Sequence, residues 1–158
     1  VEENLKMAKP DATKEEMETV LQKVNLLGFL QTQDGLQTQL LEKASNLSGG
    51  QCQRLVIARA LLRTDSAVYI FDEAASNIDV ESEELIMNVI HELAKTKTVL
   101  LISHRLANVV KSDKIYFLKD GEIKESGKHD ELMSQNGAYR HLYESQMALE
   151  NYGKGGVA

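Results

Sequence analysis

Val68-Tyr69-Ile70-Phe71-Asp72-Glu73 is the stretch of sequence that decides the fold. With Ala67 it forms an uninterrupted apolar run, residues 67–71, that ends in two acidic residues. This pattern is typical of a strand that is buried on both faces and reaches the edge of a sheet at its acidic end. A second apolar run, Thr98 to Ile102, predicts another strand of the same kind.

An amphipathic helix is expected between the two predicted strands. Asp79 can cap its N-terminus, and its apolar residues recur at three- and four-residue spacing. These residues are Leu85, Ile86, Val89, Ile90 and Leu93. A strand, helix, strand order implies parallel strands joined by a right-handed crossover, so the sequence predicts an α/β fold. Functional side chains should then gather where the parallel strands end.

The rest of the chain predicts helices and one hairpin. Residues 11–27 carry apolar side chains at helical spacing, with Gly28 as the expected stop, and Ser48 is expected to cap a helix that runs to Arg63. Asp120-Gly121 favours a tight hairpin turn. The remaining expected elements are strands at 114–119 and 122–126, helices at 106–110, 130–134 and 138–150, and a frayed tail at 153–156.

Composition and charge exclude several classes of protein. The 158 residues, 42% hydrophobic and 27% charged, fit one folded hydrophobic core. A formal net charge of -6 argues against a nucleic-acid partner, because such proteins cluster Lys and Arg. Cys52 is the only cysteine, which excludes an internal disulfide and favours a reducing, cytosolic setting. No apolar run approaches the ~20 residues of a membrane helix, so any membrane contact is expected through a partner or a further segment.

The start of the predicted helix at Ser48 has the chemistry of an anion site. Leu47-Ser48-Gly49-Gly50-Gln51, the Ser48 turn, places a hydroxyl and two glycine backbones at a helix N-terminus. Unpaired N–H groups and the helix dipole attract phosphate at such a position. The segment is also compatible with an ordinary capped helix, since capping serines are common.

Two carboxylates, Asp72 and Glu73, follow the first predicted strand and form the acid pair. Asp72 is expected to bind Mg²⁺, which prefers oxygen ligands and bridges nucleotide phosphates. Glu73 is expected to polarise an attacking water as a general base. An Asp-Glu pair after a strand is, by itself, equally compatible with a solvated loop.

Asp79 and His104 each have a structural and a functional interpretation. Asp79 can simply cap a helix. His104 follows the second predicted strand and is expected beside the acid pair, because parallel strands end at the same edge of a sheet. A lone histidine is otherwise usually a surface or packing residue. The histidines without such a setting are interpreted as structural; they are His91, His129 and His141.

Together these motifs resemble the ATPase domain of ABC transporters. The Ser48 turn with its helix resembles the family's signature motif, and Val68 to Glu73 resembles its Walker B motif. Ser76-Asn77-Ile78-Asp79 resembles the D-loop, from whose usual pattern it departs at Asn77 and Ile78. His104 resembles the switch histidine that contacts the γ-phosphate. The resemblance implies a partial P-loop NTPase fold, ATP and Mg²⁺ as ligands, and ATP hydrolysis with Glu73 and His104 as catalytic residues.

The resemblance covers almost the whole chain, and it also implies how the chain is divided into domains. Residues 1–63 would form a helical subdomain that ends with the signature helix, 64–150 the C-terminal part of the ATPase core, and 151–158 a flexible tail. Exporter-type transporters, whose ATPase is fused behind membrane helices, are resembled most closely. The stretches that carry this likeness are Ser103 to Ala107, Gly127 to Leu132 and Gly137 to Tyr143.

An exporter implies two partners and a location. A second ATPase domain, identical or different, would pair with this one, and each signature motif would cover the γ-phosphate bound by the other domain. ATP binding would close the pair and hydrolysis would allow it to open. Coupling helices of a transmembrane domain would contact the helical subdomain, at the cytoplasmic face of the membrane.

Residues 1–158 contain no P-loop, which requires Gly, four residues, and Gly-Lys-Ser/Thr. The nearest match, Gly121 to Lys128, has five residues between its glycines. Without P-loop amides and lysine, these residues alone are expected to bind ATP negligibly and to be inactive. The strand at 68–71 is expected to keep an unpaired apolar edge. Two alternatives remain open from the sequence: a soluble ABC-type ATPase without a transport role, and a catalytically silent interaction module.

Overall fold

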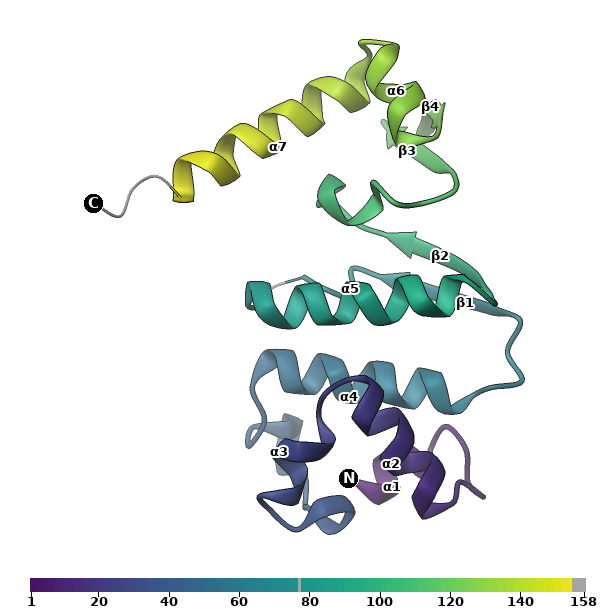
Figure 1. Ribbon diagram of the computed structural model, residues 1–158, viewed down its shortest axis with the longest axis vertical. Helices are drawn as coiled ribbons and strands as arrows, with labels where there is room; N and C mark the ends of the chain where they lie inside the picture. The colour runs from purple at the N-terminus through teal and green to yellow at the C-terminus, as the bar shows by residue number, and fades with distance from the viewer. Residues whose placement is uncertain (77, 155–158) are drawn as a thin grey trace. The chain divides into compact units, whose positions relative to one another are not determined.

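The computed structural model describes residues 1–76 and 78–154, with side chains to residue 149 (Figure 1). The chain forms two compact units, residues 1–102 and a unit that begins at Ser103. The predicted α/β class is confirmed, because the first unit contains a parallel strand pair, the second contains an antiparallel hairpin, and both contain helices. The expected boundary after residue 63 lies inside the first unit, where helices and strands share one core, and it stays a prediction.

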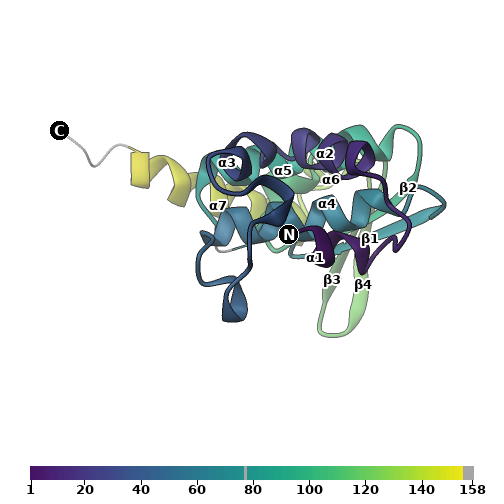
Figure 2. The same ribbon diagram turned by 90° about the horizontal axis from the view of Figure 1, so that it is seen from below.

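The N-terminal part of the first unit is helical. Its elements are α1 (Glu2–Lys6), α2 (Lys14–Lys23), α3 (Leu27–Gln31), the 3-10 turns Gly35–Gln37 and Glu42–Ala44, and α4 (Gly49–Leu62). Seen from below, α1, α2 and α3 lie in front of α4, and both α1 and α2 contact it (Figure 2). The core between them is apolar, with Leu5, Leu21, Leu26 and Leu30 fully buried.

The end of α2 differs from the prediction. Asn25 has a left-handed backbone, with φ 51°, and this turn lets the N–H of Leu26 donate to the carbonyl of Leu21 (2.9 Å). Such a hydrogen bond closes a Schellman motif, which ends a helix. The predicted stop at Gly28 is wrong: Gly28 lies inside α3, because Asn25 already supplies the left-handed residue.

The two predicted strands form a parallel pair, as the sequence indicated. β1 (Val68–Asp72) runs beside β2 (Thr98–Ile102), with Asp72 opposite Ile102 at the C-terminal end. The predicted helix between them is α5 (Val80–Ala94). In Figure 1, α4 and α5 run in the same direction, so their N-terminal ends lie on the same side of the unit.

Only one face of the strand pair is buried, which corrects the prediction of strands buried on both faces. Tyr69 and Phe71 point into the core and are each 7% exposed, whereas Val68 and Ile70 between them are 55% and 64% exposed. The buried side packs with α5 in a common core, and no described residue of this unit covers the other side. This open sheet face consists of Val68, Ile70, Leu100 and Ile102.

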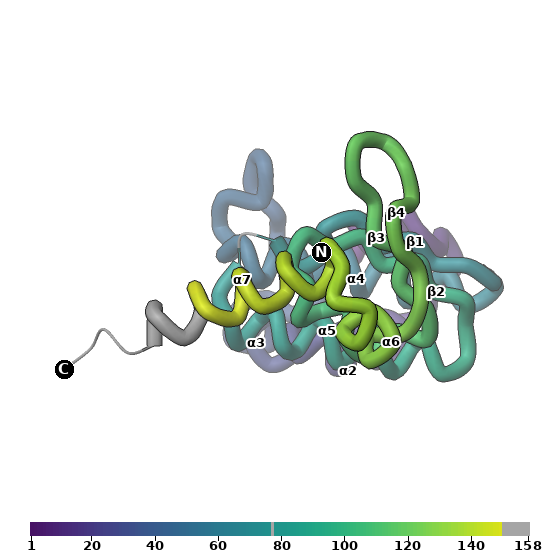
Figure 3. Tube along the Cα trace, turned by 90° about the horizontal axis from the view of Figure 1, so that it is seen from above, coloured from purple at the N-terminus to yellow at the C-terminus, as the bar shows by residue number. Residues whose placement is uncertain are grey.

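The second unit contains the predicted hairpin. Figure 3 shows β3 (Ile115–Lys119) and β4 (Glu122–Gly127) side by side, joined by Asp120 and Gly121, which both have positive φ as a tight hairpin turn requires. The other elements are a 3-10 turn (Leu106–Val109), α6 (His129–Ser134) and α7 (Ala138–Lys154). Because α7 continues to Lys154, the first part of the predicted tail is helical, and 155–158 lie outside the described residues.

The core of the second unit is built around Tyr139. This side chain is fully buried, and its hydroxyl lies 2.8 Å from Nδ1 of His129, consistent with the structural interpretation of that histidine. Glu125 of β4 caps α7 from a distance in sequence: its carboxylate accepts the N–H of Ala138 at 2.5 Å and that of Tyr139 at 3.4 Å. A carboxylate at a helix N-terminus satisfies amides that have no helical acceptor.

We expect Glu125→Ala to destabilise the second unit by about 1 kcal/mol, the usual contribution of a helix cap. The expected reason is that the first amides of α7 lose their acceptor. Thermal unfolding followed by circular dichroism measures the change. Glu122→Ala is the matched control, because Glu122 lies on the same hairpin and is exposed. Equal effects of the two substitutions would contradict the capping role.

We expect a chain of residues 1–158 to self-associate through the open sheet face, because exposed apolar side chains and unpaired strand edges favour pairing. Light scattering over a range of protein concentrations measures this association. Ile70→Lys should shift the protein toward the monomer. Met7→Lys, which alters an exposed residue outside the face, should leave the association unchanged. A wild-type chain that stays monomeric at high concentration would refute the prediction.

Candidate functional site

The Ser48 turn begins α4 with a complete capping box. The Ser48 hydroxyl accepts the N–H of Gln51 at 3.2 Å, and the Gln51 side-chain oxygen accepts the N–H of Ser48 at 2.8 Å. Ser48 and Gly49 are exposed, whereas Leu47 and Gly50 are buried. The amides of Gly49 and Gly50 lie in the first turn, where no helical carbonyl can accept them. The geometry therefore contains the expected cap, and it also presents backbone donors suited to an anion.

Gly50 allows α4 to lie unusually close to α5. A Cβ atom at position 50 would stand 2.4 Å from the Ser82 hydroxyl and 3.1 Å from a carboxylate oxygen of Asp79. Both neighbours belong to the first turn of α5 or to its cap, and Ser82 is buried. Glycine is thus required here by close approach, and the Ser48 turn lies directly against the start of α5.

The acid pair lies where β1 ends. Asp72 is the last residue of the strand and is exposed. Glu73 continues the ladder by one bond, since its N–H donates to the carbonyl of Ile102 (2.9 Å), but its backbone has turned to φ 49°. Its carbonyl accepts the N–H of Ser76 at 3.0 Å. Left-handed backbone is unfavourable for a residue with a side chain, and such positions concentrate at functional sites.

Asp79 performs the structural role that the sequence allowed. Its carboxylate accepts the N–H of Ser82 at 2.8 Å and caps α5. The hydrogen bonds from Ser82, and to a lesser extent the charge of Arg54, lower the pKa of Asp79 from its usual 3.8. Ile78 packs half-buried against the core, Ser76 is half-buried, and Asn77 lies outside the described residues. A role for Ser76 to Asp79 between two domains stays a prediction.

His104 belongs to the second unit, two residues beyond the end of β2. Its carbonyl accepts a hydrogen bond from the side-chain amide of Gln146 (2.7 Å), whose oxygen accepts the N–H of Leu106 (2.9 Å). Gln146 of α7 thus holds the backbone around His104, a contact that no sequence pattern indicated. The expected convergence of His104 with the acid pair involves both units and stays a prediction.

The donor set at the acid pair suits Mg²⁺ only together with phosphate oxygens. No group of three or more His, Cys, Asp or Glu side chains that could hold a metal occurs within the described residues. Mg²⁺ is commonly bound by one or two carboxylates plus substrate phosphates and water, and the exposed Asp72 fits that mode.

No helix within residues 1–76 and 78–154 is both long and apolar enough to cross a membrane.

Comparisons with known proteins give a consistent result. The family model described as ABC transporter matches residues 1–76. An uncharacterized ABC transporter ATP-binding protein of Haemophilus influenzae is 51% identical over 148 residues, covering 94% of this chain and 26% of the relative. An ATP-dependent lipid A-core flippase of Mannheimia succiniciproducens is 45% identical over 140 residues, covering 88% of this chain and 24% of the relative.

A solved structure is similar in fold as well as sequence. It is that of a bacterial Atm1-family ABC exporter with ATP bound, with a TM-score of 0.83 and 29% identity over 92% of this chain and 25% of the exporter chain. The chain therefore spans about a quarter of the length of these relatives.

The pKa of Asp79 gives a testable pH dependence. Because the folded-state pKa lies below the unfolded one, ionised Asp79 stabilises the fold above about pH 4, and this stabilisation is lost as the pH falls through the folded value. Asp79→Asn keeps a capping side chain without the charge. We expect the urea unfolding midpoints of wild type and Asp79→Asn to differ at pH 7, and the difference between them to change progressively as the pH falls below about 4. Asp79→Ala should be less stable than both at pH 7. If the difference in unfolding midpoint between wild type and Asp79→Asn stays the same as the pH is lowered, the lowered pKa of Asp79 is contradicted.

Proposed function

This chain belongs to the ABC transporter family of ATP-binding proteins, and from that premise we propose that it forms the C-terminal part of an ATP-hydrolysing domain that drives export across a membrane. The observation that carries the proposal is the close packing of Gly50 on Ser82, which brings the Ser48 turn against the start of α5, the helix that follows the acid pair in the chain. The exporter relatives favour this function over a soluble ATPase and over a silent interaction module.

The Ser48 turn is proposed to bind the nucleotide held by a second ATPase domain. Its exposed hydroxyl and the first-turn amides of Gly49 and Gly50 can donate to phosphate oxygens, and the dipole of α4 adds positive potential there. Leu47 is buried and anchors the turn, while Gln51 completes the cap. The turn then acts as a preformed anion cradle on the surface of one domain.

The acid pair is proposed to act on the nucleotide held by its own domain. Asp72, at the exposed end of β1, would hold Mg²⁺, which neutralises phosphate charge when it is bound. Glu73 would accept a proton from the attacking water as general base, and the ladder bond from its N–H to Ile102 fixes where its side chain begins. His104 would donate a hydrogen bond to the γ-phosphate.

Closure of two such domains on ATP is the proposed source of mechanical work. ATP bridges the P-loop of one domain and the Ser48 turn of the other, so closure depends on ATP, and hydrolysis removes the γ-phosphate that both sides contact. Ser76 to Asp79 would lie at the interface between the two sites. A transmembrane domain contacting the helices of residues 1–63 would convert closure into export, at the cytoplasmic face of the membrane.

The role of Glu73 is tested in the complete protein. Glu73→Gln keeps the size of the side chain but removes the base, so we expect ATP turnover to fall about 10²- to 10⁴-fold while ATP binding persists. Phosphate release and nucleotide binding are measured in parallel. Glu122→Gln, on the exposed hairpin, is the matched control and should leave turnover unchanged. Undiminished turnover in Glu73→Gln would rule out the proposed role.

A further inference from the structure

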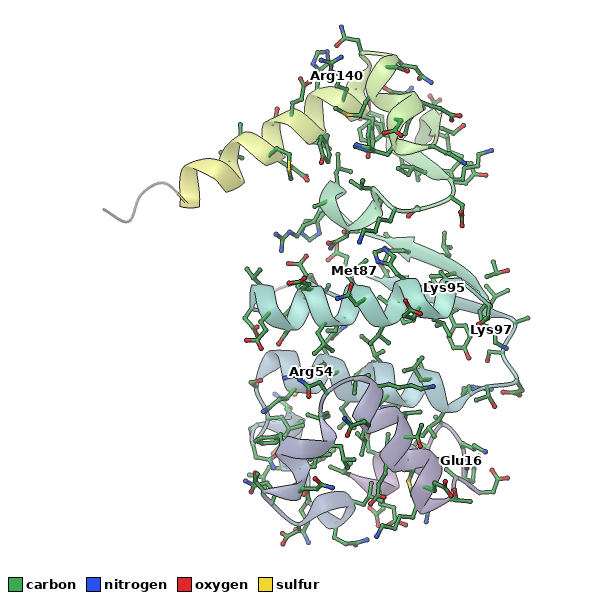
Figure 4. All side chains as sticks on the ribbon, viewed as in Figure 1. Glu16, Arg54, Met87, Lys95, Lys97 and Arg140 are labelled. Atoms are coloured by element: carbon green, nitrogen blue, oxygen red, sulfur yellow. The ribbon has the colours of Figure 1, made fainter. Side chains whose placement is uncertain are left out.

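Arg54, one helical turn beyond the Ser48 turn, joins two separate backbones. Its Nε donates to the carbonyl of Gly50 at 3.2 Å, and its Nη1 donates to the carbonyl of Asn25 at 3.1 Å. Figure 4 labels Arg54 on α4, where its side chain extends toward the helices that precede α4 in the chain. One guanidinium therefore bonds both to the first turn of α4 and to Asn25, which lies 29 positions before Arg54 in the sequence.

Both acceptors are held firmly. Asn25 is the left-handed residue that ends α2, and its neighbour Leu26 is fully buried and bonded to Leu21. Gly50 is confined on its other side by Ser82, with no space even for a methyl group. Arg54 therefore connects the end of α2 to the first turn of α4, at two positions where the backbone has little freedom to move.

The other face of the same turn carries a negative charge. Asp79, which caps α5, has a carboxylate oxygen 3.1 Å from where a Cβ of Gly50 would lie, and the positive charge of Arg54 acts on it electrostatically. The first turn of α4 is thus held by a cation bonded to its carbonyl and by the start of α5 packed on its glycine.

We propose that Arg54 is a positioning residue that sets the Ser48 turn relative to α2, and so determines how well the turn meets the nucleotide of a second domain. This inference rests on the function proposed above. The residue touches no nucleotide in this scheme; it acts through the carbonyl of Gly50. Small displacements of positioning groups have large kinetic effects, since contacts to phosphate depend on donor geometry.

The chemistry of the contact calls for arginine. A guanidinium is a planar fork with several donors, so it can bond two carbonyls at once in a fixed geometry, whereas a lysine ammonium is a compact charge on a flexible stem. Lysine at this position would keep the charge near Asp79 but would lose the rigid connection between Gly50 and Asn25. Methionine would keep an unbranched stem but would lose the guanidinium, and with it both the charge and the hydrogen bonds.

The test is the ATP dependence of turnover in the complete protein, with Arg54→Lys, Arg54→Met and the control Arg63→Met. Arg63 is exposed at the other end of α4. A displaced Ser48 turn weakens ATP-driven closure but leaves the acid pair intact, so KM for ATP should rise while the maximal rate changes little. We expect a rise of about tenfold in Arg54→Met, a smaller rise in Arg54→Lys, and none in Arg63→Met.

Three results would overturn the inference. The first is an unchanged KM in Arg54→Met. The second is wild-type behaviour of Arg54→Lys, which would show that charge alone suffices. The third is a fall in the maximal rate without a change in KM, which general misfolding would cause by reducing the amount of active enzyme. If Arg54→Met does not fold, the KM for ATP of Arg54→Lys alone tests the inference.

The inference and the proposed function fail in distinguishable ways. If ATP turnover of the complete protein does not depend on Glu73, the proposed function is refuted, and the inference with it. Glu73-dependent turnover combined with an unaltered ATP requirement in both Arg54 variants would refute the inference alone.

Discussion

The close approach of α4 to α5 at Gly50 is the constraint on which the rest of the first unit depends. Because position 50 has no side chain, the Ser82 hydroxyl occupies the space beside it, and the two helices begin side by side. The Ser48 turn and the Asp79 cap therefore belong to one packed junction. The acid pair is held at the C-terminal end of β1. There, the hydrogen bonds between β1 and β2 are extended by one more, from the N–H of Glu73 to the carbonyl of Ile102.

The same junction explains how local structure and function are related. The capping box at Ser48 and the Asp79 cap are ordinary stabilising devices, and in the proposed function the same two helix starts would meet the nucleotide or the second domain. The structural and functional interpretations of these residues are therefore compatible. Arg54 adds a link from this junction to α2, which gives the helical part of the unit a physical route to the Ser48 turn.

Elements governed by local chemistry were predicted well, and those governed by distant contacts were not. The apolar runs gave both strands, Ser48 and Asp79 gave helix starts, and Asp120-Gly121 gave the hairpin. Gly28 was a wrong stop because Asn25, three residues earlier, also tolerates left-handed backbone. The prediction that the strands are buried on both faces was wrong. An apolar run shows that both faces of a strand can be buried, but it does not show whether other residues cover them. The contacts of Arg54, Ser82, Glu125 and Gln146 join residues far apart in sequence, and no local pattern encodes them.

The proposed function depends on contact between the Ser48 turn of one domain and the nucleotide bound by another. A structure of the complete protein with a non-hydrolysable ATP analogue tests it most directly. We expect the Ser48 hydroxyl and the Gly50 amide to lie within about 2.7 to 3.2 Å of γ-phosphate oxygens of a nucleotide held by the second domain. A nucleotide-bound structure in which this turn faces solvent, far from every phosphate, would rule out this contact.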